Sequence, residues 1–213
     1  SFNSFYGYEI LGIFQNTGDV NSYSFEDDNG ISQKIQPNAK PGDFKFADLD
    51  GDGKITESDR TFIGNQIPTW TYGLTASANY MGFDIMLFCQ GVAGNKVYNA
   101  MRRLDIANAN WTSDALGRWT GEGTSDSYPR LTQSDPNKNF SLPSDFFLTS
   151  GTYFRIKTLQ IGYTLPKAIL EKVGIEQLRF YLSSNNLATF TKYNGFDPEI
   201  GGSSYGIDRG VYP

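Results

Sequence analysis

Residues Trp70–Tyr80 read Trp-Thr-Tyr-Gly-Leu-Thr-Ala-Ser-Ala-Asn-Tyr, and this stretch decides the fold class of the chain. Every even position is apolar or aromatic, whereas every odd position is glycine or a small polar residue. Such alternation predicts a β-strand with one apolar face and one polar face. A strand that crosses a bilayer needs about 9–11 residues and has aromatic residues at both interfaces. The stretch therefore predicts a membrane-spanning strand of a β-barrel.

Four further stretches alternate in the same way and are bounded by turn residues. They are Tyr6–Phe14, Phe83–Gly91, Tyr153–Leu165 and Gln177–Leu187. Within Tyr153–Leu165 the apolar positions change parity, which predicts either a β-bulge or a strand that rises above the membrane. Met81 and Gly82 predict a tight reversal, and residues 166–173 predict a short helix that begins after Pro166 and ends at Gly174.

The connections between these strands alternate between long and short. Roughly 55 residues precede Trp70–Tyr80 and roughly 60 follow Phe83–Gly91, whereas the other two connections are much shorter. Outer-membrane barrels have short periplasmic turns and long extracellular loops. We therefore expect an all-β fold, made of the C-terminal strands and long extracellular loops of a large antiparallel transmembrane barrel with a short helix near 166–173.

The composition excludes several classes of function. The chain contains no histidine and a single cysteine, Cys89, so it offers neither a histidine-based catalytic triad nor an internal disulfide. Its net charge of −5 argues against nucleic-acid binding, which requires clustered lysine and arginine. No apolar run approaches the about 20 residues of a membrane-spanning helix. The chain begins at Ser1 in what reads as mid-domain sequence without a signal peptide, so we expect a segment of a longer protein.

Residues 48–59 follow the pattern of an EF-hand calcium loop. The expected carboxylate ligands are Asp48, Asp50, Asp52 and Asp59, at positions 1, 3, 5 and 12. The backbone carbonyl of Lys54 is expected at position 7, and Thr56 is expected to act through water at position 9. Aspartate in place of glutamate at position 12 makes bidentate binding harder. The flanking residues do not read as paired helices, so we expect a structural Ca²⁺ clip and not a sensor. The alternative is an Asp/Gly-rich turn without metal.

Several sequence blocks occur in an order and spacing that resemble one known family. They are Pro41–Ile55, Asp59–Asn65, Tyr72-Gly73, Gly82–Asp84, Phe88–Gly91, Arg118–Thr120, Tyr128–Leu131, Gly151–Lys157, Gly162–Pro166 and Asn185–Glu199. Together they resemble the C-terminal part of the SusC/RagA-family TonB-dependent outer-membrane transporters, from Tyr6 to Asp208. The chain departs from the family at its end, because the closing aromatic-ended strand of the family is missing.

The resemblance implies a role in active import across the outer membrane of a Gram-negative bacterium. Members form barrels of about 22 strands with a plugged lumen. They take oligosaccharides or peptides from a SusD-like surface lipoprotein and draw energy from TonB. The resemblance implies that residues 1–213 are the C-terminal segment of such a barrel, in contact with outer-membrane lipid. The plug and the part that meets the TonB complex would precede Ser1.

Aromatic residues of the second long loop, Trp111, Trp119 and Tyr128, are candidates for stacking on a substrate. The alternative is that they fix the loop to the barrel rim. Two other functions remain open. Asp197 and Glu199, or Asp145 with another carboxylate, suggest a glycosidase pair, but no other catalytic signature accompanies them, so we expect no enzyme. A soluble secreted calcium-binding β domain that binds carbohydrate explains residues 48–59 but not the long apolar face of Trp70–Tyr80.

Overall fold

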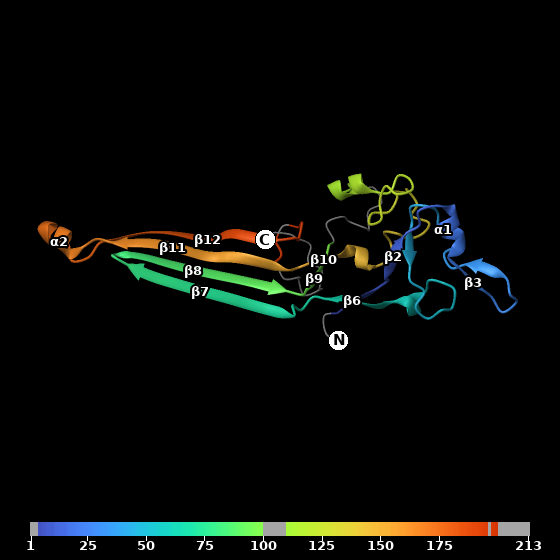
Figure 1. Cartoon of the computed structure of the whole chain (residues 1–213), viewed down its shortest axis with the longest axis horizontal. Helices are drawn as coiled ribbons and strands as arrows, with labels where there is room; N and C mark the ends of the chain where they lie inside the picture. Colours follow the sequence, from blue (N-terminus) through green and yellow to red (C-terminus); the bar gives the residue numbers. More distant parts are fainter. Residues whose placement is uncertain (1–3, 100–109, 196, 200–213) are drawn as a thin grey trace. The chain divides into compact units, whose positions relative to one another are not determined.

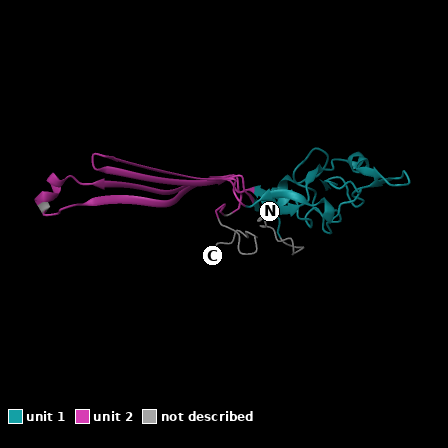
Figure 2. Cartoon of the chain, turned by 90° about the horizontal axis from the view of Figure 1, so that it is seen from below, with its two compact units in different colours: residues 1–66, 97–149, 200–213 teal, residues 67–96, 150–199 magenta. Residues whose placement is uncertain are grey.

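The structure is a computed structural model that describes residues 4–99, 110–195 and 197–199 (Figure 1). The chain divides into two compact units (Figure 2). The sheet unit consists of Ile67–Lys96 and Ser150–Glu199, and the loop unit consists of Ser1–Gln66, Val97–Thr149 and Ile200–Pro213.

A search of the described residues finds no helix with the length and apolar character that a membrane span requires.

The sheet unit contains four long antiparallel strands in the spatial order β12-β11-β8-β7 (Figure 1). Their bounds are Trp70–Tyr80 for β7, Phe83–Ala93 for β8, Tyr153–Thr164 for β11 and Arg179–Thr191 for β12. These four predicted strands are confirmed. The alternation predicts both ends of β7, whereas β8 and β12 extend further toward their C-terminal ends than the sequence indicates.

The strand register places the apolar positions of all four strands on one face, which we call the apolar face. Leu74 of β7 lies opposite Cys89 of β8, which lies opposite Ile156 of β11. Other members of this face are Ala76, Ala78, Ile85, Leu87, Leu159, Ile161 and Leu182. The polar residues Thr75, Ser77, Asn79, Asp84 and Gln90 occupy the opposite face, as their odd or even parity predicts.

Aromatic rings gather at both ends of the apolar face. At one end the rings of Tyr72 and Phe154 are stacked with centroids 6.4 Å apart, and Phe190 lies 6.2 Å beyond Phe154. At the other end the rings of Phe83 and Tyr163 lie 4.4 Å apart. Two aromatic bands that flank an apolar strip are the pattern of a barrel wall in a bilayer. The aromatic girdles that the sequence predicts are confirmed.

Strand β11 contains the predicted bulge. Its register shifts between Ile156 and Thr158 against both β8 and β12. Against β8, Lys157 is the extra residue, and it restores the apolar residues after it to the same face as those before it. Against β12, Lys157 lies opposite two residues, Asn186 and Leu187, and Asn186 has a φ of 53°. The change of parity in the sequence therefore indicates a bulge and not a strand that leaves the membrane.

The two short connections of the sheet unit also follow the sequence. Met81 and Gly82 have φ angles of 47° and 87°, the left-handed conformations of a two-residue hairpin turn. The predicted helix near 166–173 is present as α2, Lys167–Leu170, followed by the 3₁₀ turn η4, Glu171–Val173. Gly174 ends it with a φ of 70°.

The loop unit is built from short elements. They are β1 (Ser4–Gly7), β2 (Ile10–Ile13), α1 (Thr17–Ser22), β3 (Ser24–Glu26), β4 (Ser32–Lys34), β5 (Phe44–Phe46), η1 (Glu57–Asp59), β6 (Thr61–Asn65), η2 (Ser113–Gly117) and η3 (Asp145–Phe147). They form the two-stranded pairs β1-β6, β2-β5 and β3-β4. A further pair joins β9 (Lys96–Tyr98) to β10 (Leu148–Ser150). In the described residues the long connections thus form short two-stranded pairs, most of which join segments far apart in the sequence.

The predicted strand Tyr6–Phe14 is wrong as a single membrane strand. Its residues form β1 and β2, which pair with different partners outside the four-stranded sheet. Between them the Tyr8 N–H donates to the Pro143 carbonyl at 2.9 Å. A Cβ atom at Gly7 would lie 2.3 Å from that same carbonyl oxygen, so the backbone of a distant loop packs directly on the chain at the end of β1.

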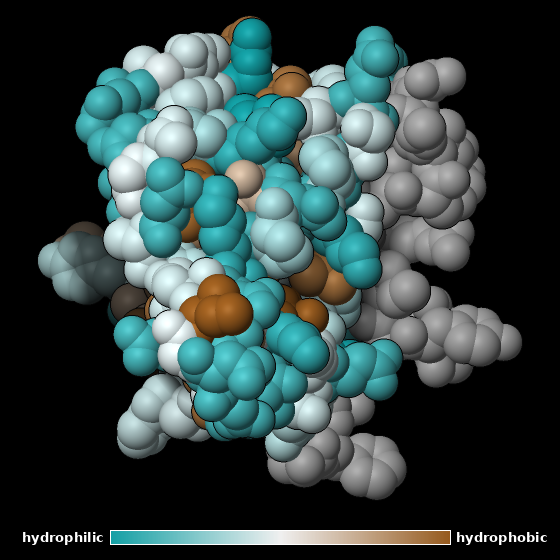
Figure 3. All heavy atoms as spheres, turned by 90° about the vertical axis from the view of Figure 1, so that its right-hand side faces the viewer, coloured by the Kyte–Doolittle hydropathy of each residue, from teal (hydrophilic) through white to brown (hydrophobic). Residues whose placement is uncertain are grey.

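Two small aromatic-rich clusters form the core of the loop unit. One contains the buried residues Tyr8, Ile13, Phe44 and Phe46, and the other contains Phe14, Val20 and Ala39. The surface seen in Figure 3 is mostly hydrophilic, with hydrophobic side chains scattered among polar ones. The loop unit therefore has small buried clusters and single exposed apolar residues, in contrast to the continuous apolar face of the sheet unit.

Candidate metal loop and loop clamp

The carboxylates of Asp48, Asp50 and Asp52 converge within the loop unit. One oxygen from each lies within 4.8 Å of the others. Asp48 is half-buried, whereas Asp50 and Asp52 are exposed. Three like charges this close repel one another, and a divalent cation among them would remove that repulsion. The structure thus brings together the three predicted ligands at positions 1, 3 and 5.

The aspartates reach this arrangement because each accepts backbone N–H groups from further along the loop. Asp48 accepts from Gly51 at 2.8 Å and from Gly53 at 2.9 Å. Asp50 accepts from the Asp52 N–H at 3.1 Å, and Asp52 accepts from the Lys54 N–H at 2.9 Å. These local bonds turn the chain tightly and keep the carboxylates on its inner side.

Gly53 is required at position 6 for two reasons. Its φ is 77°, a conformation that side chains disfavour. A Cβ atom there would also lie 2.3 Å from the ring of Phe25, which packs directly on the loop backbone. The loop is therefore anchored on the β3–β4 hairpin as well as by its own hydrogen bonds.

Asp59 lies outside the group of three carboxylates and closes the loop instead. It is fully buried, and its two oxygens accept from the N–H groups of Leu49 and Thr56, each at 2.7 Å. Thr56 accepts from the Ser58 N–H at 3.2 Å and, together with Asp59, caps η1. These bonds join position 12 to positions 2 and 9 and close the loop.

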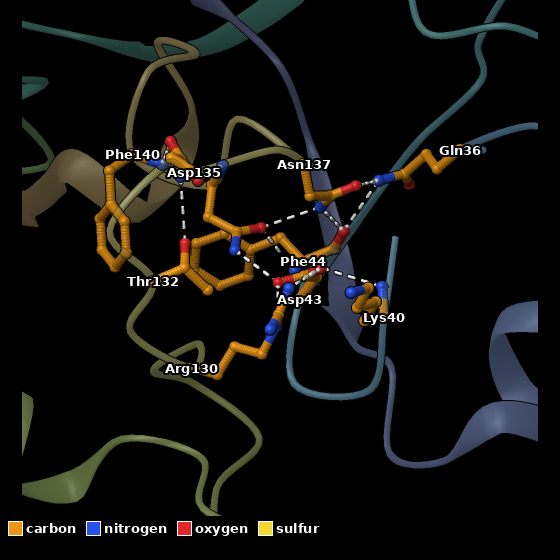
Figure 4. Close-up of polar contacts among 10 residues, drawn as sticks. Gln36, Lys40, Asp43, Phe44, Arg130, Thr132, Asp135, Asn137 and Phe140 are labelled. Carbon is orange, nitrogen blue, oxygen red and sulfur yellow. Dashed lines mark hydrogen bonds and ion pairs between the residues drawn. The ribbon is translucent and has the colours of Figure 1, made fainter. Parts of the chain in front are cut away.

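A buried ion pair, which we call the Asp43 clamp, connects the two long loops (Figure 4). The Asp43 carboxylate is 0% exposed and accepts from Arg130 Nε at 2.6 Å and Nη2 at 3.0 Å. It also accepts from the Lys40 N–H at 2.9 Å and from Asn139 Nδ2 at 2.8 Å. A bidentate arginine with further donors is the arrangement that compensates the burial of a carboxylate.

Side-chain amides extend the clamp along β5 (Figure 4). Asn139 Oδ1 accepts from the Phe44 N–H at 3.0 Å, and Asn137 Nδ2 donates to the Phe44 carbonyl at 3.0 Å. Gln36 Oε1 accepts from the Phe46 N–H at 2.8 Å. Strand β2 pairs with one edge of β5, and these amides serve as the partner on the other edge.

Asp135 fixes the turn that presents these asparagines. Its carboxylate accepts from the N–H groups of Asn139, Phe140 and Ser141 at 2.7 Å, 2.9 Å and 3.1 Å. Asp135 and Lys138 adopt φ angles of 40° and 59°, which are unusual for residues with a side chain. The turn is thus strained locally and held by the carboxylate.

The three candidate substrate-binding aromatics lie against the core of the loop unit. The Trp119 ring packs over Gly42, where a Cβ atom would lie 2.4 Å from it, and its Nε1 donates to Gln15 at 3.2 Å. Trp111 lies edge-on to Phe140 with ring centroids 4.9 Å apart, and Tyr128 lies edge-on to Phe146 at 5.3 Å. All three remain half-buried. These contacts show how the rings order the loop, and substrate contact by them stays a prediction.

Arg155 holds both carboxylates of the pair Asp197 and Glu199 in the sheet unit. Its guanidinium contacts Asp197 at 2.6 Å and Glu199 at 2.5 Å, and Lys157 contacts Glu199 at 2.7 Å. Burial raises the pKa of Asp197, but hydrogen bonds from Arg155 and the Glu199 N–H outweigh it and leave the pKa below the usual value. A glycosidase acid needs a raised pKa. The pair is therefore better explained as an anchor for residues 197–199.

Sequence reasoning did not find the partners in these ion pairs. Asp43 and Arg130 both occur in blocks that carry the family resemblance, yet 87 residues separate them. Asp84 and Arg179 are also far apart in the sequence, and their carboxylate and guanidinium meet at 2.6 Å on the polar face, although Arg179 lies outside those blocks. The available signal was a charged residue of each sign inside otherwise aromatic or glycine-rich blocks.

Comparisons with known proteins agree on one group. No family model matches the chain. TonB-dependent receptor P3 of Formosa agariphila is 34% identical over 99% of the chain, which covers 21% of that receptor. TonB-dependent receptor SusC of Bacteroides thetaiotaomicron is 24% identical over 85% of the chain and 17% of SusC. A solved structure of the RagAB peptide transporter matches with a TM-score of 0.66 and 26% identity, over 99% of the chain and 21% of the matched chain.

Proposed function

Because the chain belongs to the SusC/RagA-like TonB-dependent receptors and spans about a fifth of their length, we propose that it forms part of the outer-membrane barrel of a nutrient importer. The observation that carries the proposal is the apolar face of the sheet unit, with aromatic bands at both ends and polar residues behind it. A soluble calcium-binding domain would have to expose this face to water. Trp70 and Leu182 are 70% and 76% exposed in the sheet unit.

In this proposal the long loops face the outside of a Gram-negative cell, and the turns at Met81-Gly82 and 165–178 face the periplasm. The receptor imports oligosaccharides or other large nutrients with a SusD-like lipoprotein and uses energy from TonB. The names of the relatives support this view, since they are TonB-dependent receptors, and one matched structure is called a peptide transporter. The proposal assigns no catalytic role to the chain.

The import function is tested with the full-length receptor in cells. We expect a strain without the receptor to lose uptake of a labelled oligosaccharide or peptide, and a strain without TonB to lose it equally. A tagged receptor should also co-purify a surface lipoprotein. Uptake that persists without TonB, with the receptor still in the outer membrane, would contradict energised import.

We also propose that residues 48–59 bind Ca²⁺ as a structural clip. The proposed ligands are Asp48, Asp50, Asp52, the Lys54 carbonyl, Thr56 through water and Asp59, whose carboxylate would exchange its hydrogen bonds to Leu49 and Thr56 for the ion. The convergence of the three aspartates supports this proposal. The ion would hold the loop under Phe25 and so stabilise its contact with the β3–β4 hairpin.

The clip predicts that chelation of Ca²⁺ makes residues 48–59 of the full-length receptor accessible to protease, and that added Ca²⁺ reverses this. Replacing both Asp50 and Asp52 by asparagine keeps oxygens that can accept the turn hydrogen bonds but removes two charges. We expect Ca²⁺ affinity to fall by about tenfold or more. The measurement is cleavage rate against Ca²⁺ concentration. Asp28→Asn, at an exposed acid of the same unit, is the control. A cleavage rate that changes neither with the chelator nor with the substitution would contradict Ca²⁺ binding and favour a turn without metal.

A further inference from the structure

A cavity of about 950 Å³ lies within the loop unit. Its walls come from the second half of the 48–59 loop, the segment from Gln33 to Asn38 and the turn around Lys138. We call it the lysine pocket, after its lining residues Lys34, Lys54 and Lys138. Its volume lies within the range of about 300–1,000 Å³ that is usual for ligand sites.

The charge of the lysine pocket is opposite to that of the chain. The chain has a net charge of −5, yet the pocket is lined by three lysines and only one acidic residue, Glu57. All three lysine side chains are exposed, and within the described part of the chain none of them forms an ion pair. Their ammonium groups therefore remain available to a negatively charged ligand.

Tyr8 adds an unused donor to this pocket. The residue is only 5% exposed, and it lines the cavity. Its hydroxyl forms no hydrogen bond with any other described residue, although a buried tyrosine usually finds a partner. Burial raises the pKa of Tyr8 above its usual value, so the hydroxyl stays protonated and able to donate. The hydroxyl is not fully buried, and it has no partner among the described residues, so it can donate to a ligand oxygen in the cavity.

The remaining lining favours a sugar over a peptide. Ile35, Ile55 and Leu142 supply an apolar surface between the lysines, which suits the C–H faces of a sugar ring. The amides of Gln36 and Asn137 are already bonded to β5 and to each other. A peptide that binds by strand addition needs a free strand edge. On β5 that edge is occupied by these amides, and a peptide probe tests addition to β4, which lines the cavity and pairs only with β3 among the described strands.

We propose that the lysine pocket binds an acidic oligosaccharide, with its carboxylate or sulfate groups on the ammonium groups of Lys34, Lys54 and Lys138. The Tyr8 hydroxyl donates to a ligand oxygen. The site goes beyond the proposed import function and does not depend on it, because a surface glycan site can exist on a receptor whatever the receptor imports.

The test uses the full-length receptor in detergent and measures binding by calorimetry at low ionic strength. The probes are tetragalacturonate, a sulfated neutral tetrasaccharide, maltotetraose and tetraglutamate. We expect the two acidic sugars to bind and maltotetraose to bind at least about tenfold more weakly. The tighter of the two acidic sugars identifies carboxylate or sulfate as the preferred group.

Three variants distinguish the loss of the pocket's lysine charges from a general effect on folding. The triple variant K34Q/K54Q/K138Q should weaken acidic-sugar binding by about tenfold or more, because each lysine contributes up to several-fold. Tyr8→Phe should weaken it by several-fold without a change in charge. Lys40→Gln, at an exposed lysine that does not line the pocket, should bind like the wild type. Equal binding by the triple variant, equal binding of maltotetraose, or tighter binding of tetraglutamate would overturn the proposal.

Discussion

Replacing Asp43 by alanine is expected to destabilise the loop unit by about 3 kcal/mol. The substitution leaves the Arg130 guanidinium without its carboxylate and removes the acceptor for Lys40 and Asn139. Loss of one partner of a buried ion pair costs about 3–5 kcal/mol. We expect the lower end of this range because the Arg130 side chain is 22% exposed and can reach water.

Hydrogen exchange of the full-length receptor measures this effect. Amides of residues 36–46 and 130–142 should exchange about a hundredfold faster in the Asp43→Ala variant, since each 1.4 kcal/mol corresponds to about tenfold. Asp28→Ala removes an exposed acid of the same unit and should leave these amides unchanged. The double variant Asp43→Leu with Arg130→Met should be less destabilised than Asp43→Ala, because no unpaired charge remains. Unchanged exchange after Asp43→Ala would show that the clamp does not hold the two loops together.

Replacing Leu74 by arginine is expected to prevent most of the receptor from assembling in the outer membrane. Leu74 lies near the middle of β7 on the apolar face, where it is 60% exposed in the sheet unit. An arginine that faces lipid near the bilayer midplane costs about 2–4 kcal/mol. The adjacent Thr75 lies on the opposite face, so Thr75→Arg places the same charge on the interior of the barrel, where we expect it to be tolerated.

The fraction of each variant that migrates as a folded barrel before boiling, in purified outer membranes, measures assembly. Thr75→Arg should resemble the wild type, whereas Leu74→Arg should be strongly depleted. The two substitutions introduce arginine at adjacent positions of β7. A difference in assembly between them therefore reports which face of the strand contacts lipid. Equal assembly of both variants would contradict a lipid-facing role for the apolar face.

The sheet unit was largely predictable because its signals are local. Alternation with a period of two follows from the backbone of a strand, and it predicted both ends of β7. The change of parity in Tyr153–Leu165 predicted either a bulge or a strand that rises above the membrane, and the register shows a bulge at Lys157 against β8. The spacing of Asp48, Asp50 and Asp52 likewise predicted that their carboxylates converge, because hydrogen bonds within the same loop produce that arrangement.

The prediction for Tyr6–Phe14 failed because alternation alone does not say which strand will pair with it. The segment alternates like the membrane strands, yet β1 pairs with β6 and β2 pairs with β5. The Pro143 carbonyl approaches the backbone between them, and Gly12 has a φ of 144° where the register of β2 shifts. A distant loop therefore divides a segment that reads as one continuous strand.

The sequence by itself determined the strands, the apolar and polar faces, the hairpin turn, the short helix and the pattern of the 48–59 loop. Each of these depends on residues a few positions apart, so local spacing is enough. Only the tertiary structure decided that Asp43 meets Arg130, that Arg155 holds Glu199, and that Tyr8 lies in one cavity with Lys138. These contacts join residues that are 44 to 130 positions apart, and they depend on how the long loops pack. No local spacing encodes that packing.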